Sequence, residues 1–183
     1  RSSAQNDPLL PMQWNLINRG DMFTTGEVVK SVEGADVQVE KAWERATGNE
    51  EVIVAVLDEG VDYTHPDLVA NMWVNPREVA GSTKDNDGNG YAGDIHGYNF
   101  IKNLGQITTN DIYDSGHGTH VAGVISAVNN NGEGVASIAG GDGSKGGVKI
   151  MSCQVFSGQL SGTSLQVVRA IKYAADNGAV VLQ

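Results

Sequence analysis

An aspartate and a histidine in two separate segments have the residue types and settings for acid–base chemistry. Asp58 directly follows the apolar run VIVAVL, residues 52–57. His117 stands between two glycines, just before a helical pattern. A carboxylate that accepts the Nδ1–H of an imidazole fixes its tautomer, and it stabilises the imidazolium that forms when the other ring nitrogen takes a proton. Such a pair is two thirds of a nucleophile-activating triad.

Three apolar runs predict the strands that must position this pair. They cover residues 52–57, 148–156 and 179–183, and they are continuous rather than alternating, which is typical of parallel strands buried on both faces. Two helical patterns separate them. The first follows His117, and the second ends at Asn177-Gly178. The candidate caps for the second helix are Ser161, Thr163 and Ser164.

The alternation of strands and helices predicts an α/β fold, with a parallel sheet flanked by helices in three layers. Catalytic groups in such folds gather at the carboxyl ends of the strands, so we expect Asp58 and His117 to meet at that edge. Residues 1–34 have little periodicity and are predicted to form an N-terminal arm on the surface, while 35–183 form the domain itself.

Composition narrows the function classes. The formal net charge is −10, which argues against nucleic acid as a partner and favours divalent cations. No apolar run reaches about 18 residues, so no transmembrane segment is predicted. The only cysteine, Cys153, excludes an internal disulfide. Its place in the middle of an apolar strand predicts a buried, inert thiol.

The segment DNDGNGY, residues 85–91, places oxygen-bearing side chains at alternate positions and a glycine at the sixth, like the first half of an EF-hand loop. Hard oxygen ligands around a flexible turn favour Ca²⁺. The alternative is an Asx-rich turn without a metal. The predicted ligands are Asp85, Asp87, Asn89 and Asp94.

One glycine-rich segment could suggest a phosphate-binding loop, but we reject this interpretation. GDGSKGG, residues 141–147, precedes a predicted strand and lacks Lys-Ser/Thr at its end, whereas a phosphate loop follows a strand and opens a helix. The first strand is not followed by a glycine-rich turn either, so a nucleotide-binding α/β domain is rejected.

Two motifs carry a resemblance to a known family. DEGVDYTHPDL, residues 58–68, is similar to the aspartate motif of the subtilisin-like serine proteases (subtilases), and DSGHGTHVAGVISA, residues 114–127, closely resembles their histidine motif. The resemblance continues through GVKIMSCQVF and SLQVVRAIKYAADNGAVV, from about residue 36 to the end. It implies that Asp58 orients the imidazole and that His117 is the general base, and later the acid, of an Asp-His-Ser triad.

The sequence departs from the family pattern in two ways. Glu59 stands where subtilases have Ser or Thr. The family's nucleophilic serine, in a Gly-Thr-Ser-Met-Ala motif, and its oxyanion asparagine both lie downstream of the position that matches Gln183. The GTS at 162–164 has Leu-Gln after it and is interpreted as a helix cap. The resemblance therefore implies the N-terminal portion of a catalytic domain, whose sheet is incomplete here and whose primary specificity pocket lies elsewhere.

The resemblance also implies a second calcium site and a substrate-binding edge. In the family, calcium is shared by the Asp of His-Pro-Asp-Leu, an Asn after the histidine helix and often an acid from the N-terminal arm. Here these are Asp67, Asn130 and Asp7, and the length of NNNGEG leaves Asn129 or Asn131 possible. The segment that pairs with an extended peptide or protein substrate corresponds to Leu160, Ser161 and Gly162.

The functional hypothesis is a calcium-stabilised serine endopeptidase that is secreted or bound at the cell surface or in the periplasm. The alternative is a non-catalytic subtilase-like domain used for binding or calcium-dependent structure. A serine and an oxyanion asparagine in the missing segment would decide between them.

The strand at 179–183 carries an expectation about a partner. It is predicted to be buried, and its apolar surface and backbone groups need the rest of the sheet to cover them. We expect this polypeptide not to fold stably alone. The C-terminal remainder would be either the second chain of a nicked protease or a continuation of this one.

Overall fold

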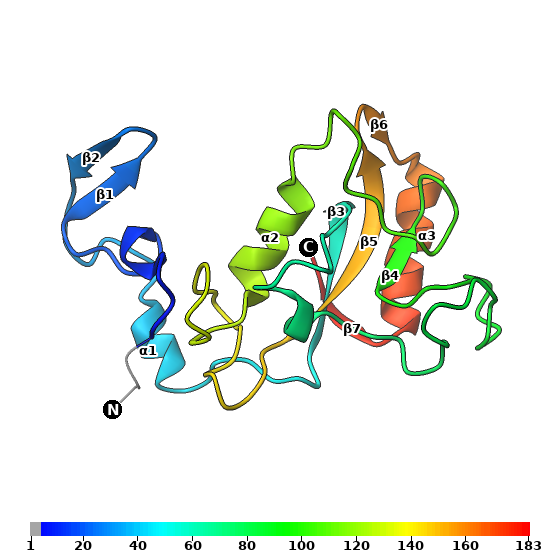
Figure 1. The fold of residues 1–183 in the computed structure, drawn as a ribbon, viewed down its shortest axis with the longest axis horizontal. Coiled ribbons are helices and arrows are strands. Elements are labelled where there is room, and N and C mark those ends of the chain that lie inside the picture. Colours follow the sequence, from blue (N-terminus) through cyan, green and yellow to red (C-terminus); the bar gives the residue numbers. More distant parts are fainter. Residues whose placement is uncertain (1–4) are drawn as a thin grey trace.

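The computed structural model describes residues 5–183, and its centre is a five-stranded, mostly parallel sheet (Figure 1). Along the sheet lie, in order, β4 (Gly97–Asn99), β5 (Lys149–Ser157), β3 (Ile53–Glu59) and β7 (Ala179–Leu182). These neighbours pair in parallel, and the short β6 (Leu160–Ser161) folds back antiparallel on β5. The predicted α/β class is confirmed.

One long helix covers each face of the sheet. The helix α2 (His117–Ser126) and the helix α3 (Ser164–Asp176) lie on opposite sides in Figure 1. Side chains of β3 alternate between the two resulting cores, as the pleat of a strand requires. Val54 and Val56 pack in the cluster that contains Ala122 of α2, whereas Ala55 packs in the cluster of α3. The core therefore fixes both helices against the same strand.

Helix α3 begins and ends where its sequence provides partners for the backbone. Thr163 is its N-cap: the Gln166 N–H donates to Thr163 Oγ1, and the Thr163 N–H donates to Gln166 Oε1. This reciprocal pair satisfies two amides that the helix leaves free. Gly178, with φ of +93°, follows the last turn. Of the three candidate caps, Thr163 is the residue used.

The chain before β3 contains more regular structure than the predicted surface arm. It holds an antiparallel hairpin of β1 (Asp21–Thr24) and β2 (Glu27–Lys30), a short helix α1 (Val39–Trp43) and a 3₁₀ turn at Leu10–Met12; a second 3₁₀ turn, Val69–Asn71, follows β3. The hairpin projects away from the main sheet (Figure 1). A small core of Leu16, Val39, Trp43 and Ala136 joins this part to the loop after α2.

Two strand predictions need correction. Asp58 does not follow the first strand but belongs to it, because the β3–β5 pairing continues to Glu59 with a register shift between these two residues. The strand at 179–183 is not buried in the described chain: Val180 is 70% exposed and Val181 51%. Among the described residues β7 pairs only with β3, at the edge of the sheet.

No helix within residues 5–183 has the length and apolar character needed to cross a membrane.

Candidate active site and metal sites

Asp58 and His117 meet at the carboxyl edge of the sheet. His117 Nδ1 lies 2.9 Å from Asp58 Oδ1 and 2.8 Å from Oδ2. The Asp58 side chain is only 14% exposed, whereas that of His117 is 64% exposed. Within residues 5–183, the hydrogen bonds of the ring involve Nδ1 alone. The arrangement holds one ring nitrogen on a carboxylate and leaves the imidazole accessible to a further group.

Glycines allow the close approach that brings the two residues together. A Cβ on Gly118, the second residue of α2, would lie 2.2 Å from the main-chain oxygen of Glu59 in β3. A Cβ on Gly60 would lie 2.2 Å from the main-chain oxygen of Thr108. Neither contact leaves room for a side chain. Gly118 therefore allows the start of α2 to approach β3, and Gly60 allows the loop at Thr108 to pack against the end of β3.

The Asp58 carboxylate changes the proton affinity of the imidazole. The hydrogen bond with Asp58, followed by the charge of Asp58, raises the pKa of His117 above its ordinary value of 6.5. Both causes stabilise the imidazolium. The geometry thus suits a base that takes up a proton and holds it during a reaction.

The predicted substrate-binding residues lie at the carboxyl end of β5, on the same edge of the sheet as Asp58. Ser161 pairs with Phe156 and Leu160 with Ser157, and the Gly162 N–H donates to the Val155 carbonyl at 2.6 Å. Leu160 is 60% exposed. The hairpin of β5 and β6 presents an extended backbone at the surface.

The acidic loop gathers three carboxylates, one of which the sequence analysis did not name. One oxygen each of Glu78, Asp87 and Asp94 lie within 4.8 Å of one another. Asp94 is fully buried. Its Oδ2 accepts from the Tyr173 hydroxyl at 2.7 Å and from Asn89 Nδ2 at 2.9 Å. Its Oδ1 has no partner among the described residues.

The pKa of Glu78 is raised, first by burial and further by the neighbouring Asp87 and Asp94 carboxylates. A cation would relieve this repulsion and satisfy the free oxygen of Asp94. Glu78 lies outside the DNDGNGY segment, so the spacing of the motif could not identify it.

The other two predicted ligands of this loop, Asp85 and Asn89, make hydrogen bonds with main-chain groups. Asp85 is exposed, and its carboxylate accepts the N–H groups of Asn89 and Gly90 at 3.1 and 2.9 Å. The Asn89 side-chain oxygen accepts the Tyr91 N–H. The structure therefore brings Asp87 and Asp94 together, while Asp85 and Asn89 accept main-chain N–H groups of the turn beside them and stay predicted ligands.

The predicted second calcium site lies where the N-terminal segment meets the loop after α2. Asp7 and Asp67 are each 3% exposed. The pKa of Asp7 is raised, chiefly by burial and also by the Asp67 charge. The Asn130 and Asn131 N–H groups donate to the Asp7 carboxylate. Gln5, two residues before Asp7, also has a buried side-chain oxygen without a partner among the described residues.

The three candidate asparagines of this loop differ in what their side chains contact. Asn131 Nδ2 donates to Asp67 Oδ1 at 2.8 Å. Asn130 Oδ1 accepts the Asn6 N–H, and Asn129 is fully buried against main-chain groups. Asn131 is thus the asparagine whose side chain reaches Asp67.

Cys153 is fully buried in β5, and burial raises the pKa of its thiol far above the ordinary range. It has the environment expected of an inert thiol.

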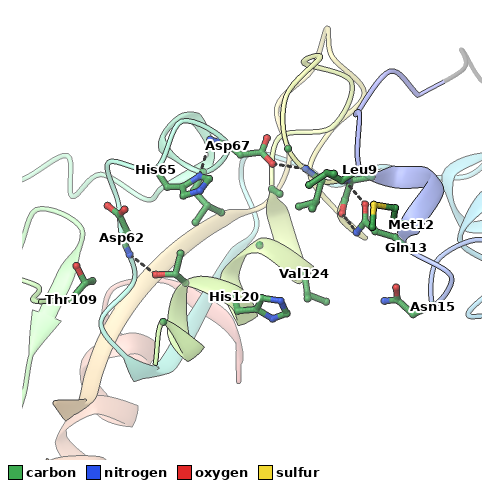
Figure 2. Close-up of a pocket in the computed structure, with 18 residues that line it drawn as sticks. Leu9, Met12, Gln13, Asn15, Asp62, His65, Asp67, Thr109, His120 and Val124 are labelled. Atoms are coloured by element: carbon green, nitrogen blue, oxygen red, sulfur yellow. Dashed lines mark hydrogen bonds between the residues drawn. The ribbon is translucent and has the colours of Figure 1, made fainter. Parts of the chain in front are cut away.

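A pocket of about 660 Å³ borders the outer side of α2 (Figure 2). Its lining includes His120 and Val124 from the helix and Leu9 and Met12 from the N-terminal segment. Val124 is 45% exposed. The sheet-facing side of α2 is therefore packed, while its opposite side opens onto a cavity with an apolar wall.

Comparison with known proteins identifies the family. The sequence model of the subtilase family matches residues 49–182. Subtilisin-like protease 1 of Plasmodium vivax is 32% identical over 175 residues, which cover 95% of this chain and 24% of that protein. The cell wall-associated protease of Bacillus subtilis is 31% identical over 182 residues, which cover 98% of this chain and 16% of that protein. The chain belongs to the subtilase family, as its motifs predict.

A solved structure supports the fold. The serine protease of Aeromonas sobria, in complex with its chaperone, matches with a TM-score of 0.66 at 22% identity; the match covers 93% of this chain and 24% of that one. This likeness bears on the fold alone. The chain spans about a quarter of the length of the Plasmodium vivax relative.

The Asp58–His117 geometry predicts a pH response. The carboxylate stabilises the imidazolium, so Asp58→Asn should lower the pKa of His117, as measured by NMR titration of the intact protein. Since only the neutral imidazole can accept a proton, the fraction of His117 able to act as a base should rise with pH through a midpoint above 6.5. A His120→Ala variant assigns the signal of the other histidine of α2. An unchanged His117 titration in Asp58→Asn would contradict the geometry.

Proposed function

We propose that this chain supplies the Asp and His of a serine endopeptidase, with the nucleophilic serine contributed by a segment of the intact protein outside these 183 residues. The observation that carries the proposal is the hydrogen bond of 2.8 Å between His117 Nδ1 and Asp58 Oδ2 at the carboxyl edge of the sheet. Membership of a family whose named relatives are proteases supports it.

The chemistry follows from the two ring nitrogens of His117. Asp58 accepts the Nδ1–H and keeps the proton off Nε2, which is then free to take the proton of a serine hydroxyl as it attacks a peptide carbonyl. The imidazolium formed is stabilised by the same carboxylate. In the second half of the step His117 returns its proton to the leaving amine, so that the peptide bond breaks and an acyl-enzyme forms.

Removing the base tests this function. His117→Ala in the intact protein should abolish nearly all peptide hydrolysis, because the members of a triad act as a unit. The expected loss of kcat is about 10⁴-fold or more, measured with a chromogenic peptide. Glu51→Ala, which removes an exposed side chain before the other end of β3, is the control and should keep its activity. Peptidase activity that persists in His117→Ala would refute the proposal, and an inactive native protein would favour a non-catalytic domain.

The exposed backbone of β6 is the proposed substrate edge. An extended peptide could add to Leu160–Ser161 by main-chain pairing, which gives affinity with little sequence preference. We infer a broad range of extended peptide segments as substrates.

Replacing Ser161 by proline tests this edge, because proline removes one N–H donor from β6. We expect KM for a peptide substrate to rise by about tenfold, with kcat less affected. Ser161→Ala keeps the backbone donor and serves as the control. Equal KM values for both variants, or a peptidic inhibitor bound without contact to residues 160–162, would contradict the proposal.

We also propose calcium at two positions. Glu78, Asp87 and Asp94 offer clustered carboxylates and one buried oxygen without a partner among the described residues, and all of these donors are hard oxygens that suit Ca²⁺. Bound there, the ion would join the loop before β4 to α3 through Tyr173.

At the second position Asp67, Asp7 and Gln5 would provide the oxygens. If the side-chain amide of Asn131 rotated by a half-turn, its oxygen would face Asp67 and would be the fourth oxygen ligand.

Chelation tests the calcium sites. Metal that binds only the folded state stabilises it by about 2.7 kcal/mol at a hundredfold excess over Kd, so EDTA should lower the melting temperature of the intact protein. Glu78→Gln with Asp87→Asn should remove part of this response, and Asp67→Asn the other part. Glu51→Gln, an exposed carboxylate outside both clusters, is the control. A melting curve indifferent to EDTA in the native protein would exclude both sites.

The remainder of the catalytic domain is the proposed partner of two surfaces. The first is the exposed apolar side of β7, and the second is the pocket beside α2 (Figure 2).

We further propose that the protein acts outside the cell or in the cell envelope, as the name of the Bacillus subtilis relative suggests for that protein.

A further inference from the structure

Glu59 makes contacts that its position beside a catalytic aspartate does not require. Its Oε2 accepts the main-chain N–H of His117 at 2.9 Å and that of Ser115 at 3.2 Å. Its Oε1 accepts the Ser115 hydroxyl at 3.1 Å. One carboxylate of β3 thus holds the segment that leads into α2.

Helix α2 lacks a cap from its own sequence. Its N-cap is Gly116, which has φ of +76° and no side chain to accept a hydrogen bond. The first N–H groups of a helix have no acceptor within the helix, and a negative charge beside them is favourable. Glu59 provides both an acceptor and a charge, from a strand more than 50 residues earlier in the chain.

A register shift in the sheet makes these contacts possible. Successive side chains of a regular strand point to opposite faces, so Asp58 and Glu59 could not both face α2. The β3–β5 pairing shifts between these two residues, with Asp58 opposite Gln154 and Glu59 opposite Phe156. Such an irregularity redirects a side chain. As a result, both carboxylates reach residues at the start of α2.

We propose that Glu59 is a positioning residue for the general base: it fixes the main chain of His117 while Asp58 fixes the ring. This inference rests on the proposed peptidase function. The two contacts act on opposite ends of one residue, at 2.9 Å on the backbone nitrogen and 2.8 Å on Nδ1. Without the first, the N–H of His117 loses its acceptor, and the main chain that carries the ring is held less firmly.

Three substitutions in the intact protein separate the parts of this role. Glu59→Ala removes the acceptor, and we expect kcat for a peptide substrate to fall by about 100-fold, with KM changed by less than about threefold. Glu59→Gln keeps an acceptor oxygen at the same reach and should recover at least about tenfold of that loss. Glu59→Asp keeps the charge but shortens the reach, and should resemble the alanine variant.

A second readout does not depend on activity. In the native protein the His117 amide should exchange slowly with solvent, and Glu59→Ala should speed this exchange by at least about tenfold, as measured by NMR. Glu51→Ala removes an exposed glutamate before the other end of β3 and should change neither readout. Melting curves establish that each variant folds; should Glu59→Ala fail to fold, Glu59→Gln and Glu59→Asp carry the comparison.

The outcomes distinguish this inference from the proposed function. Native protein without peptidase activity would refute the function, while hydrogen exchange would still test the contact with Glu59. Active native protein with Glu59→Ala and Glu59→Asp at full kcat would overturn the inference. A change confined to KM would also overturn it, because it would indicate that Glu59 contacts the substrate.

Discussion

The hydrogen bond between Asp58 and His117 is the interaction that the rest of the structure must position. It joins the end of a strand to the start of a helix, and both elements must be held in register for it to form. The apolar cores on the two faces of β3 provide that register. Gly118 then permits the final approach, because a Cβ there would collide with the main-chain oxygen of Glu59.

The second constraint on the folded chain is that its many acidic side chains need partners. The chain carries a net charge of −10, and several of its carboxylates are buried. Each of them needs a partner, because a buried charge without one is costly. Two half-buried carboxylates have partners within the chain: Asp58 has the imidazole, and Glu59 has main-chain N–H groups at the start of α2. The clusters around Asp94 and Asp67 contain carboxylates close to one another, and a cation is the partner that we propose for them.

The sequence sufficed to predict the parallel sheet, the two long helices and the family, because continuous apolar runs and helical periodicity are local patterns. It also predicted that Asp58 and His117 meet, since both stand at the carboxyl edge. The β1–β2 hairpin was missed because its residues are largely exposed and follow no strong apolar alternation. Glu78 was missed because its place beside Asp87 depends on loop geometry rather than on spacing. The contacts of Glu59 depend on a register shift that no local pattern announces.

The central claim is that His117 is the base of a peptidase, and covalent labelling tests it most directly. A peptidyl chloromethyl ketone bound as a substrate alkylates the free ring nitrogen of the base beside it. Mass spectrometry of the labelled intact protein should find the adduct on His117, and not on His120, three residues further along α2. Labelling should also stop the peptidase activity in proportion. Full modification of another residue, with His117 unlabelled and activity lost, would contradict the account.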